Sequence, residues 1–253
     1  MLEIQNLTKR YRNISVVDDV SFNVRPGEVT GYLGPNGSGK STTVKIITGL
    51  LEPTAGRVLL DGKDIRDDLL GFRRRLGYIP EEAILYSYLT GLEYLQLMGR
   101  LRSLPLPDVE RRANDLLELF SLGAYRHAPI STYSKGMKQR VLISAALMHD
   151  PDVLILDEPL SGIDVTSALL FKHLLGELAR RGKTILYISH VLEVVEKVCA
   201  QVIIIYRGKI MAADSVERLR DLMNAPSLEG IFSQLVEQRD MEAVARDIVA
   251  AIQ

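Results

Sequence analysis

The sequence predicts an α/β fold: a mostly parallel sheet with an inserted helical subdomain, joined to an antiparallel β-subdomain. Three observations predict it. Short strand-like segments with turns fill the first 60 residues, helical patterns fill about residues 88–150, and apolar strands alternate with helices after residue 150. Continuous apolar strands alternating with helices are typical of a parallel sheet covered on both faces. We therefore expect one α/β core that is interrupted by helices.

The first elements follow from turn residues and apolar runs. Pro26-Gly27 marks a turn between two strand-like runs, and the glycine-rich stretch after residue 33 leads into a helical pattern that stops near Pro53. We expect strands over 20–24 and 28–33, a helix from 39 to about 50, and a strand over 56–60 with a hairpin turn at 61–62.

The later elements follow in the same way. Thr90 is a candidate cap for a helix with apolar residues to position 101, and Pro105 and Pro107 separate it from a helix over 108–120. We then expect strands over 153–156, 184–188 and 202–206, helices over 166–180 and 191–199, and small helices in the last 40 residues. The predicted division is residues 1–213 as the main domain, with its helical subdomain at about 88–150, and 214–253 as a C-terminal helical extension.

Composition excludes several classes. Lysine plus arginine (31) nearly balances aspartate plus glutamate (32), so net charge gives no attraction to nucleic acid, which we do not expect as a partner. The single cysteine, Cys199, fits a reducing cytosol, and the N-terminus lacks the pattern of a signal peptide. Since no stretch of 18 apolar residues occurs, any membrane association is expected to pass through another protein or a surface contact.

One segment matches the phosphate-loop pattern G-x-x-x-x-G-K-[ST] at every fixed position. Glycines let successive backbone N–H groups turn towards a phosphate, and the positive end of the following helix points to the same place. The lysine can reach the β- and γ-phosphates, and the serine hydroxyl can bind Mg²⁺. A dinucleotide site is disfavoured because G-x-G-x-x-G is not present. The expected nucleotide-binding residues here are Gly34, Pro35, Asn36, Gly37, Ser38, Gly39, Lys40, Ser41 and Thr42.

A second segment ends a buried strand in two carboxylates. Asp157 and Glu158 follow the apolar run 153–156, and strand ends of a parallel sheet emerge where ligands bind. Alone, such an ending is more often a solvated strand end. Downstream of a phosphate loop, we expect Asp157 to hold Mg²⁺ and Glu158 to act as general base on the attacking water.

Further segments resemble the ATP-binding subunits of ABC transporters. The run Tyr133-Ser134-Lys135-Gly136-Met137-Lys138-Gln139-Arg140 resembles their signature motif, residues 161–164 resemble their D-loop, and His190 matches their switch histidine. Tyr11 is similar to the aromatic residue that stacks on adenine in the family. These motifs stand in the family's order over about residues 2–213.

The resemblance departs from the family pattern at two positions. Lys135 replaces the first glycine of the signature, although Gly136 is kept. Glu81 stands where the family usually has the glutamine of the Q-loop, and a carboxylate can also bind Mg²⁺ but adds negative charge beside the phosphates. We expect Glu81 or the neighbouring Glu82 to be the ligand, with Glu81 as the first choice.

The resemblance implies a function and partners. It implies ATP hydrolysis with Mg²⁺ by a head-to-tail dimer, in which Ser134, Lys135 and Gly136 of one chain face the phosphate loop of its mate. It implies catalytic roles for Lys40, Glu158 and His190. It also implies a separate transmembrane permease and a peripheral position on the cytoplasmic face of the cell membrane. The signature wording and the single compact domain resemble the ABC-2 group, so we expect export rather than import, and a homodimer.

Other classes explain the sequence less well. A soluble ABC ATPase of translation would carry two phosphate loops, and a DNA-repair ABC protein would carry a long coiled coil, of which no heptad run appears. A GTPase or kinase leaves the signature unexplained. A nucleotide sensor that does not hydrolyse ATP remains an alternative, and it depends on whether Glu158 acts as the base.

Overall fold

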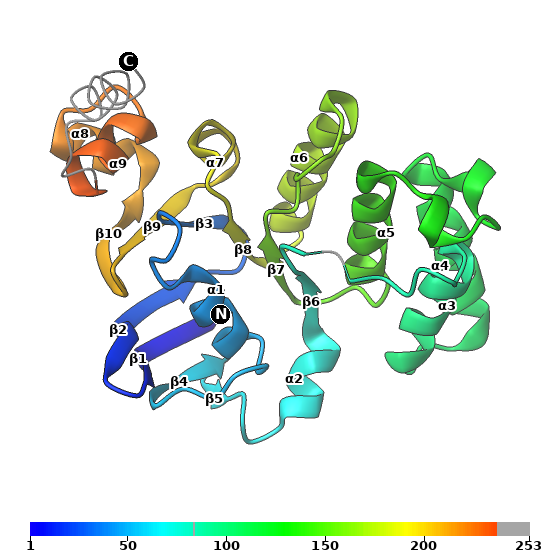
Figure 1. The fold of residues 1–253 in the computed structure, drawn as a ribbon, viewed down its shortest axis with the longest axis horizontal. Helices are drawn as coiled ribbons and strands as arrows, with labels where there is room; N and C mark the ends of the chain where they lie inside the picture. Colours follow the sequence, from blue (N-terminus) through cyan, green and yellow to red (C-terminus); the bar gives the residue numbers. More distant parts are fainter. Residues whose placement is uncertain (83, 237–253) are drawn as a thin grey trace, which may run out of the picture.

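The computed structural model describes residues 1–82 and 84–236. Its N-terminal part is an antiparallel sheet with the strand order β2-β1-β4-β5 (Figure 1). A left-handed Asp61 and Gly62 form the tight turn between β4 and β5, as predicted. The strands of this sheet are β1 (Leu2–Tyr11), β2 (Ile14–Val24), β4 (Ala55–Leu60) and β5 (Lys63–Asp64).

The second sheet has the order β10-β9-β3-β8-β7-β6 and confirms the mostly parallel core. All neighbouring pairs from β9 to β6 run parallel, and only the edge pair of β10 with β9 is antiparallel. Its strands are β3 (Val29–Leu33), β6 (Leu76–Ile79), β7 (Val153–Asp157), β8 (Thr184–Ile188), β9 (Gln201–Tyr206) and β10 (Lys209–Ser215).

The central strands are buried on both faces because each face meets a different core. In β7, Leu154 and Leu156 join a core shared with α6 (Val165–Arg180) and α7 (Leu192–Val198). Val153 and Ile155 point the other way, into a core shared with α1 (Lys40–Ile47) and the antiparallel sheet. Since side chains alternate along a strand, a continuous apolar run is what two-sided burial requires.

The middle of the chain forms helices to one side of the parallel sheet (Figure 1). Thr90 begins α3 with the predicted cap: its hydroxyl accepts from the Glu93 N–H, and the Glu93 carboxylate accepts from the Thr90 N–H. The helices of this part are α3 (Gly91–Leu101), α4 (Leu106–Leu119), the short η1 (Gly123–Tyr125) and η2 (Ile130–Thr132), and α5 (Lys135–Leu147).

Helix α5 is shared between two cores. Leu142 and Ile143 pack into the core of the parallel sheet, whereas Val141 packs with the residues of α3 and α4. A helix that is apolar on more than one side is a buried helix. The β6 strand approaches it closely, because a Cβ on Gly77 would lie 2.6 Å from the Ala146 carbonyl oxygen. The α5 helix therefore joins the helical part to the sheet.

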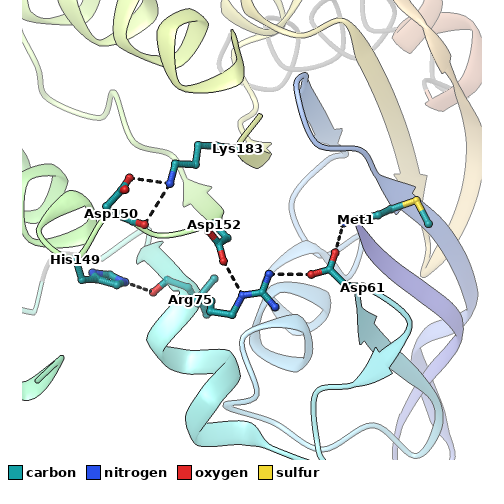
Figure 2. Close-up of polar contacts among 8 residues, drawn as sticks. Met1, Asp61, Arg75, His149, Asp150, Asp152 and Lys183 are labelled. Carbon is teal, nitrogen blue, oxygen red and sulfur yellow. Dashed lines mark hydrogen bonds and ion pairs between the residues drawn. The ribbon is translucent and has the colours of Figure 1, made fainter. Parts of the chain in front are cut away.

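Polar contacts connect the antiparallel sheet, α2 (Leu69–Arg75) and the parallel sheet (Figure 2). Arg75, at the end of α2, donates to Asp61 at 2.8 Å and to Asp152 at 2.6 Å, and so bridges the two sheets. His149, just after α5, has Nε2 3.0 Å from the Leu76 carbonyl oxygen.

The described C-terminal elements are β10 and two helices, α8 (Val216–Met223) and α9 (Leu228–Val236). The predicted small helices of the last 40 residues are confirmed up to residue 236, and positions 237–253 lie outside the described residues. Across residues 1–82 and 84–236, none of the helices combines the length and the apolar character needed to cross a bilayer.

Candidate functional site

The phosphate loop connects β3 to α1, as predicted, and its glycines are needed for space. A Cβ on Gly34 would lie 2.3 Å from the Ile205 carbonyl oxygen, and one on Gly39 would lie 2.6 Å from the Val16 carbonyl oxygen. Gly37 and Gly39 have φ angles of 78° and 108°, which side chains disfavour. The loop is therefore built from backbone, which leaves its N–H groups to face a ligand.

Lys40 is the first residue of α1, so its ammonium lies near the positive end of the helix and the loop. Its Nζ donates to the carbonyl oxygens of Gly34 at 2.7 Å and Pro35 at 3.1 Å. Burial lowers the pKa of Lys40, while nearby Glu158, Asp157 and Glu81 oppose this shift. A half-buried cation at the start of a helix is suited to an anionic phosphate, whereas the three carboxylates leave room for a metal cation beside it.

Asp157 ends β7 in a buried position, beside other acidic groups. Burial raises the pKa of Asp157 to about 7, Glu81 and Glu158 add to this effect, and Lys40 opposes it. These acidic groups favour a bound cation, and Ser41, Glu81 and Asp157 line one cavity and offer the oxygen ligands that Mg²⁺ prefers. In the described part of the chain, no cluster of three His, Cys, Asp or Glu side chains forms a complete cage for a metal. Magnesium fits nonetheless, because it is usually held by one or two carboxylates together with phosphates and water.

Glu158 follows β7 with a left-handed φ of 47°, and its carboxylate is held by three donors or ring atoms. One oxygen, Oε1, accepts from the His190 N–H at 2.8 Å and lies 2.6 Å from His190 Nδ1. The other, Oε2, accepts from the Ser189 hydroxyl at 3.0 Å. The strand register explains this meeting, because Asp157 of β7 lies beside Ile188 of β8. Glu158 and His190 thus form one unit although they are 32 residues apart.

One cavity of about 170 Å³ brings most of the predicted residues together. Its lining comes from the phosphate loop, the ends of β6 and β7, and the segment after β8. Val16 of β2 also lines it. The predicted residues in its lining are Asn36, Gly37, Gly39, Lys40, Ser41, Thr42, Glu81, Asp157, Glu158 and His190. A second cavity of about 280 Å³ is lined by Gly34, Pro35, Asn36, Glu81 and His190 among others. The Ser38 hydroxyl is buried and has no hydrogen-bond partner among the described residues.

The signature residues lie elsewhere. Ser134 caps α5, with its hydroxyl accepting from the Met137 N–H at 3.2 Å. Lys135 donates to the Ser161 hydroxyl at 2.9 Å, and a Cβ on Gly136 would lie 2.8 Å from the Gly162 carbonyl oxygen. Neither cavity is lined by residues 134–136, and Figure 1 shows β7, α6 and β6 between α1 and α5. One chain alone does not bring the phosphate loop and the predicted second phosphate-binding surface together.

Tyr11 also lies apart from the cavity. It ends β1 with an exposed side chain, and the Lys9 ammonium lies 5.3 Å from the centre of its ring. Its proposed contact with adenine stays a prediction.

Two residues of the site were not assigned a role from the sequence. Val16 lines the phosphate cavity, and Ser189 binds the Glu158 carboxylate. Ser189 directly precedes His190 at the end of an apolar strand, so its position could have suggested a role. Val16 carries no such signal, because only tertiary packing places its backbone beside Gly39 of the loop.

The comparisons with known proteins agree with this geometry. The family model described as "ABC transporter" matches residues 17–161. The ABC transporter ATP-binding protein NatA of Bacillus subtilis is 36% identical over 93% of this chain and 98% of its own length. The Nod factor export ATP-binding protein I of Ralstonia nicotianae is 38% identical over 84% of this chain and 66% of its own length.

A solved structure shares the fold. The dimeric ATP-binding cassette MJ0796, in a post-hydrolysis state bound to ADP and phosphate, has a TM-score of 0.79 and 28% identity, and the match covers 85% of this chain and 98% of that one. It confirms the predicted α/β fold of a phosphate-loop ATPase. With a family model that matches more than half of its residues and a relative alike over nearly full length, the chain belongs to the ABC transporter family, as an ATP-binding and ATP-hydrolysing subunit.

Proposed function

We propose that this subunit hydrolyses Mg²⁺–ATP in a site completed by a second copy of the chain, and that the cycle drives export through a separate membrane permease. The observation that carries the dimer is the separation of the Ser134 turn from the cavity beside Lys40. Each chain offers one phosphate loop and one signature turn, so two head-to-tail chains complete two sites. The dimeric state of MJ0796 supports this arrangement.

The chain's own residues divide the work within such a site. The loop of residues 34–42, with Lys40 as its cation, binds the phosphates, and Tyr11 stacks on the adenine. Ser41, Asp157 and Glu81 would hold Mg²⁺, which supplies charge neutralisation at the phosphates when bound. Glu158 takes the proton of the attacking water, and His190 orients the Glu158 carboxylate through the 2.6 Å contact. Ser134, Lys135 and Gly136 at the start of α5 approach the γ-phosphate from the second chain.

The permease docks on a groove beside the helical part. A hollow of about 520 Å³ lies between the end of α1, α2 and the end of α3. Leu50, Leu70 and Leu101 in its lining are exposed, and Arg73, Arg74 and Arg102 lie among them. Apolar groups with a basic rim suit an apolar segment that carries acidic residues. The exposed Tyr86 and Tyr88, which precede the start of α3, offer a second candidate surface for the permease.

This docking places the subunit on the cytoplasmic face of the cell membrane. Export is supported by the likeness of the signature and Q-loop wording to the ABC-2 group and by the relative named for Nod factor export. We keep residues 1–213 as the nucleotide-binding domain and 214–253 as its extension. Because positive and negative side chains nearly balance, the net charge gives no attraction to nucleic acid, and we propose no nucleic-acid partner.

Mixing two inactive variants tests the composite site. Lys40→Ala disables the phosphate loop and Ser134→Arg blocks the signature turn. A mixed dimer then holds one intact site, made from the loop of one variant and the turn of the other. With random pairing, half the dimers are mixed and about a quarter of the wild-type ATPase activity should return.

The matched control mixes Lys40→Ala with Glu158→Gln. Both lesions then fall on the loop side, so every site stays defective and no activity should return. If the first mixture is no more active than its two components measured separately, the shared site is refuted.

A further inference from the structure

The described C-terminal helices, α8 and α9, pack into the core of the parallel sheet. Leu228 and Ile231 of α9, with Val216 and Leu219 of α8, are buried in the same cluster as Val195 of α7. In Figure 1, α8 and α9 lie on the same side of the sheet as α7. Burial of this extent fixes the position of α9 relative to the rest of the molecule.

Polar contacts of Glu196 connect α7 to α8 and α9. Glu196 of α7 accepts a hydrogen bond from the Leu228 N–H at 3.4 Å, at the start of α9. The same carboxylate pairs with Arg220 of α8 at 3.3 Å, and Arg220 also donates to the Pro226 carbonyl oxygen. A carboxylate at the start of a helix is favourable because the helix end is positive. The α7 helix begins two residues after His190, so α9 is anchored to the helix that follows the catalytic segment.

Phe232 of α9 faces the phosphate loop. It lines the 280 Å³ cavity together with Pro35, Asn36, His190 and Leu192. Phe232 and Leu192 also pack against the common core, while Val191 between Leu192 and His190 is largely exposed. The segment 189–191 therefore has Glu158 on one side and, across this cavity, the aromatic ring of α9 on the other.

We infer that Phe232 is a positioning residue that keeps the segment 189–192 in place, so that His190 stays 2.6 Å from the Glu158 carboxylate. The inference rests on the proposed roles of Glu158 and His190. Leu192 is the first residue of α7, and it packs on the same core and lines the same cavity as Phe232. A ring at this place limits how far the backbone before Leu192 can move. A shift of about 1 Å in a catalytic group can lower a rate by orders of magnitude. The C-terminal helices thus take part in hydrolysis through Phe232, which lines the cavity beside His190.

The test compares the ATPase kinetics of the full-length chain with those of four variants. Phe232→Ala should lower kcat about 10-fold or more and change KM for ATP by less than about 3-fold, because the phosphate loop itself is intact. Phe232→Leu keeps most of the apolar volume, so it folds if Phe232→Ala does not, and it should restore at least half of kcat. Leu235→Ala is the matched control, since Leu235 packs on the same core from α9 but does not line the cavity. It should lower the melting temperature without lowering kcat.

The Glu158→Gln variant distinguishes a failure of this inference from a failure of the proposed function. It should slow turnover by roughly 10²- to 10⁴-fold while ATP still binds, as expected for loss of a general base. A slow Glu158→Gln variant beside a Phe232→Ala variant with full kcat would overturn the inference alone. Equal losses of kcat in Leu235→Ala and Phe232→Ala would also overturn it, because the effect would then be one of stability. Normal turnover in Glu158→Gln would overturn the proposed function.

Discussion

Replacing His149 by glutamine should make the protein more resistant to mild acid. The imidazole lies between α5 and β6, with Nε2 3.0 Å from the Leu76 carbonyl oxygen (Figure 2). Burial lowers the pKa of His149 to about 4, and repulsion from Arg102 adds to the effect. Its Nδ1 is buried without a hydrogen-bond partner among the described residues, so a proton there would find no acceptor.

The size of the effect follows from proton linkage. In the unfolded chain His149 has its ordinary pKa of 6.5, so the unfolded state binds a proton below that pH. The folded state binds this proton only below about pH 4. Stability is therefore lost as the pH falls from about 7 towards 4. At pH 5 the shift corresponds to roughly 2 kcal/mol, and because the ring is only partly buried, solvent screening reduces this to about 1 kcal/mol.

The assay is urea unfolding of the wild type and of His149→Gln at pH 7.5 and pH 5. Glutamine can donate the same hydrogen bond to Leu76 but has no charged form, so the wild type should lose about 1 kcal/mol more than the variant. His173→Gln, which removes an exposed histidine of α6, is the control and should behave as the wild type. If His149→Gln and the wild type lose the same free energy between the two pH values, the reasoning is wrong.

Two further predictions concern the site and its partner. Glu81→Gln should keep Mg²⁺–ATP binding, measured by calorimetry, because the amide oxygen is still a ligand and one negative charge beside Asp157 is removed; complete loss of binding would show that the carboxylate is essential. Substituting Leu70 and Leu101 by serine, or Tyr86 and Tyr88 by alanine, should abolish co-purification with the permease while ATPase activity of the isolated chain persists, and an intact complex in both would rule out the docking surface.

The parallel core could be predicted from the sequence because its strands are buried on both faces. The runs in β7, β8 and β9 are apolar over four or more successive residues, which is the pattern that burial on both faces requires. The edge strand β10 could not, since its residues alternate between partly and largely exposed. The short β6 was not predicted as a strand, because four residues give too little pattern to identify one.

The site could be predicted where its residues belong to local motifs, as in the phosphate loop and at Asp157 and Glu158. Positions 34–42 form one loop, and their role follows from spacing alone. The contact of Ser189 with Glu158 depends on the register of β7 with β8, which no local pattern reveals. The same holds for Phe232, which reaches the cavity only because α9 packs on α7.

The double packing of α5 has a consequence for exchanging parts between relatives. The α3–α4 hairpin packs mainly in a core of its own, with Leu116 also against the core of the parallel sheet. A crossover placed ahead of Ser134 would exchange this hairpin and leave the central layers of the recipient intact. A crossover placed after His149 would instead carry over a helix whose Val141 side and Leu142 side must each match a different set of partners. Chimeras with the earlier junction should be the soluble ones.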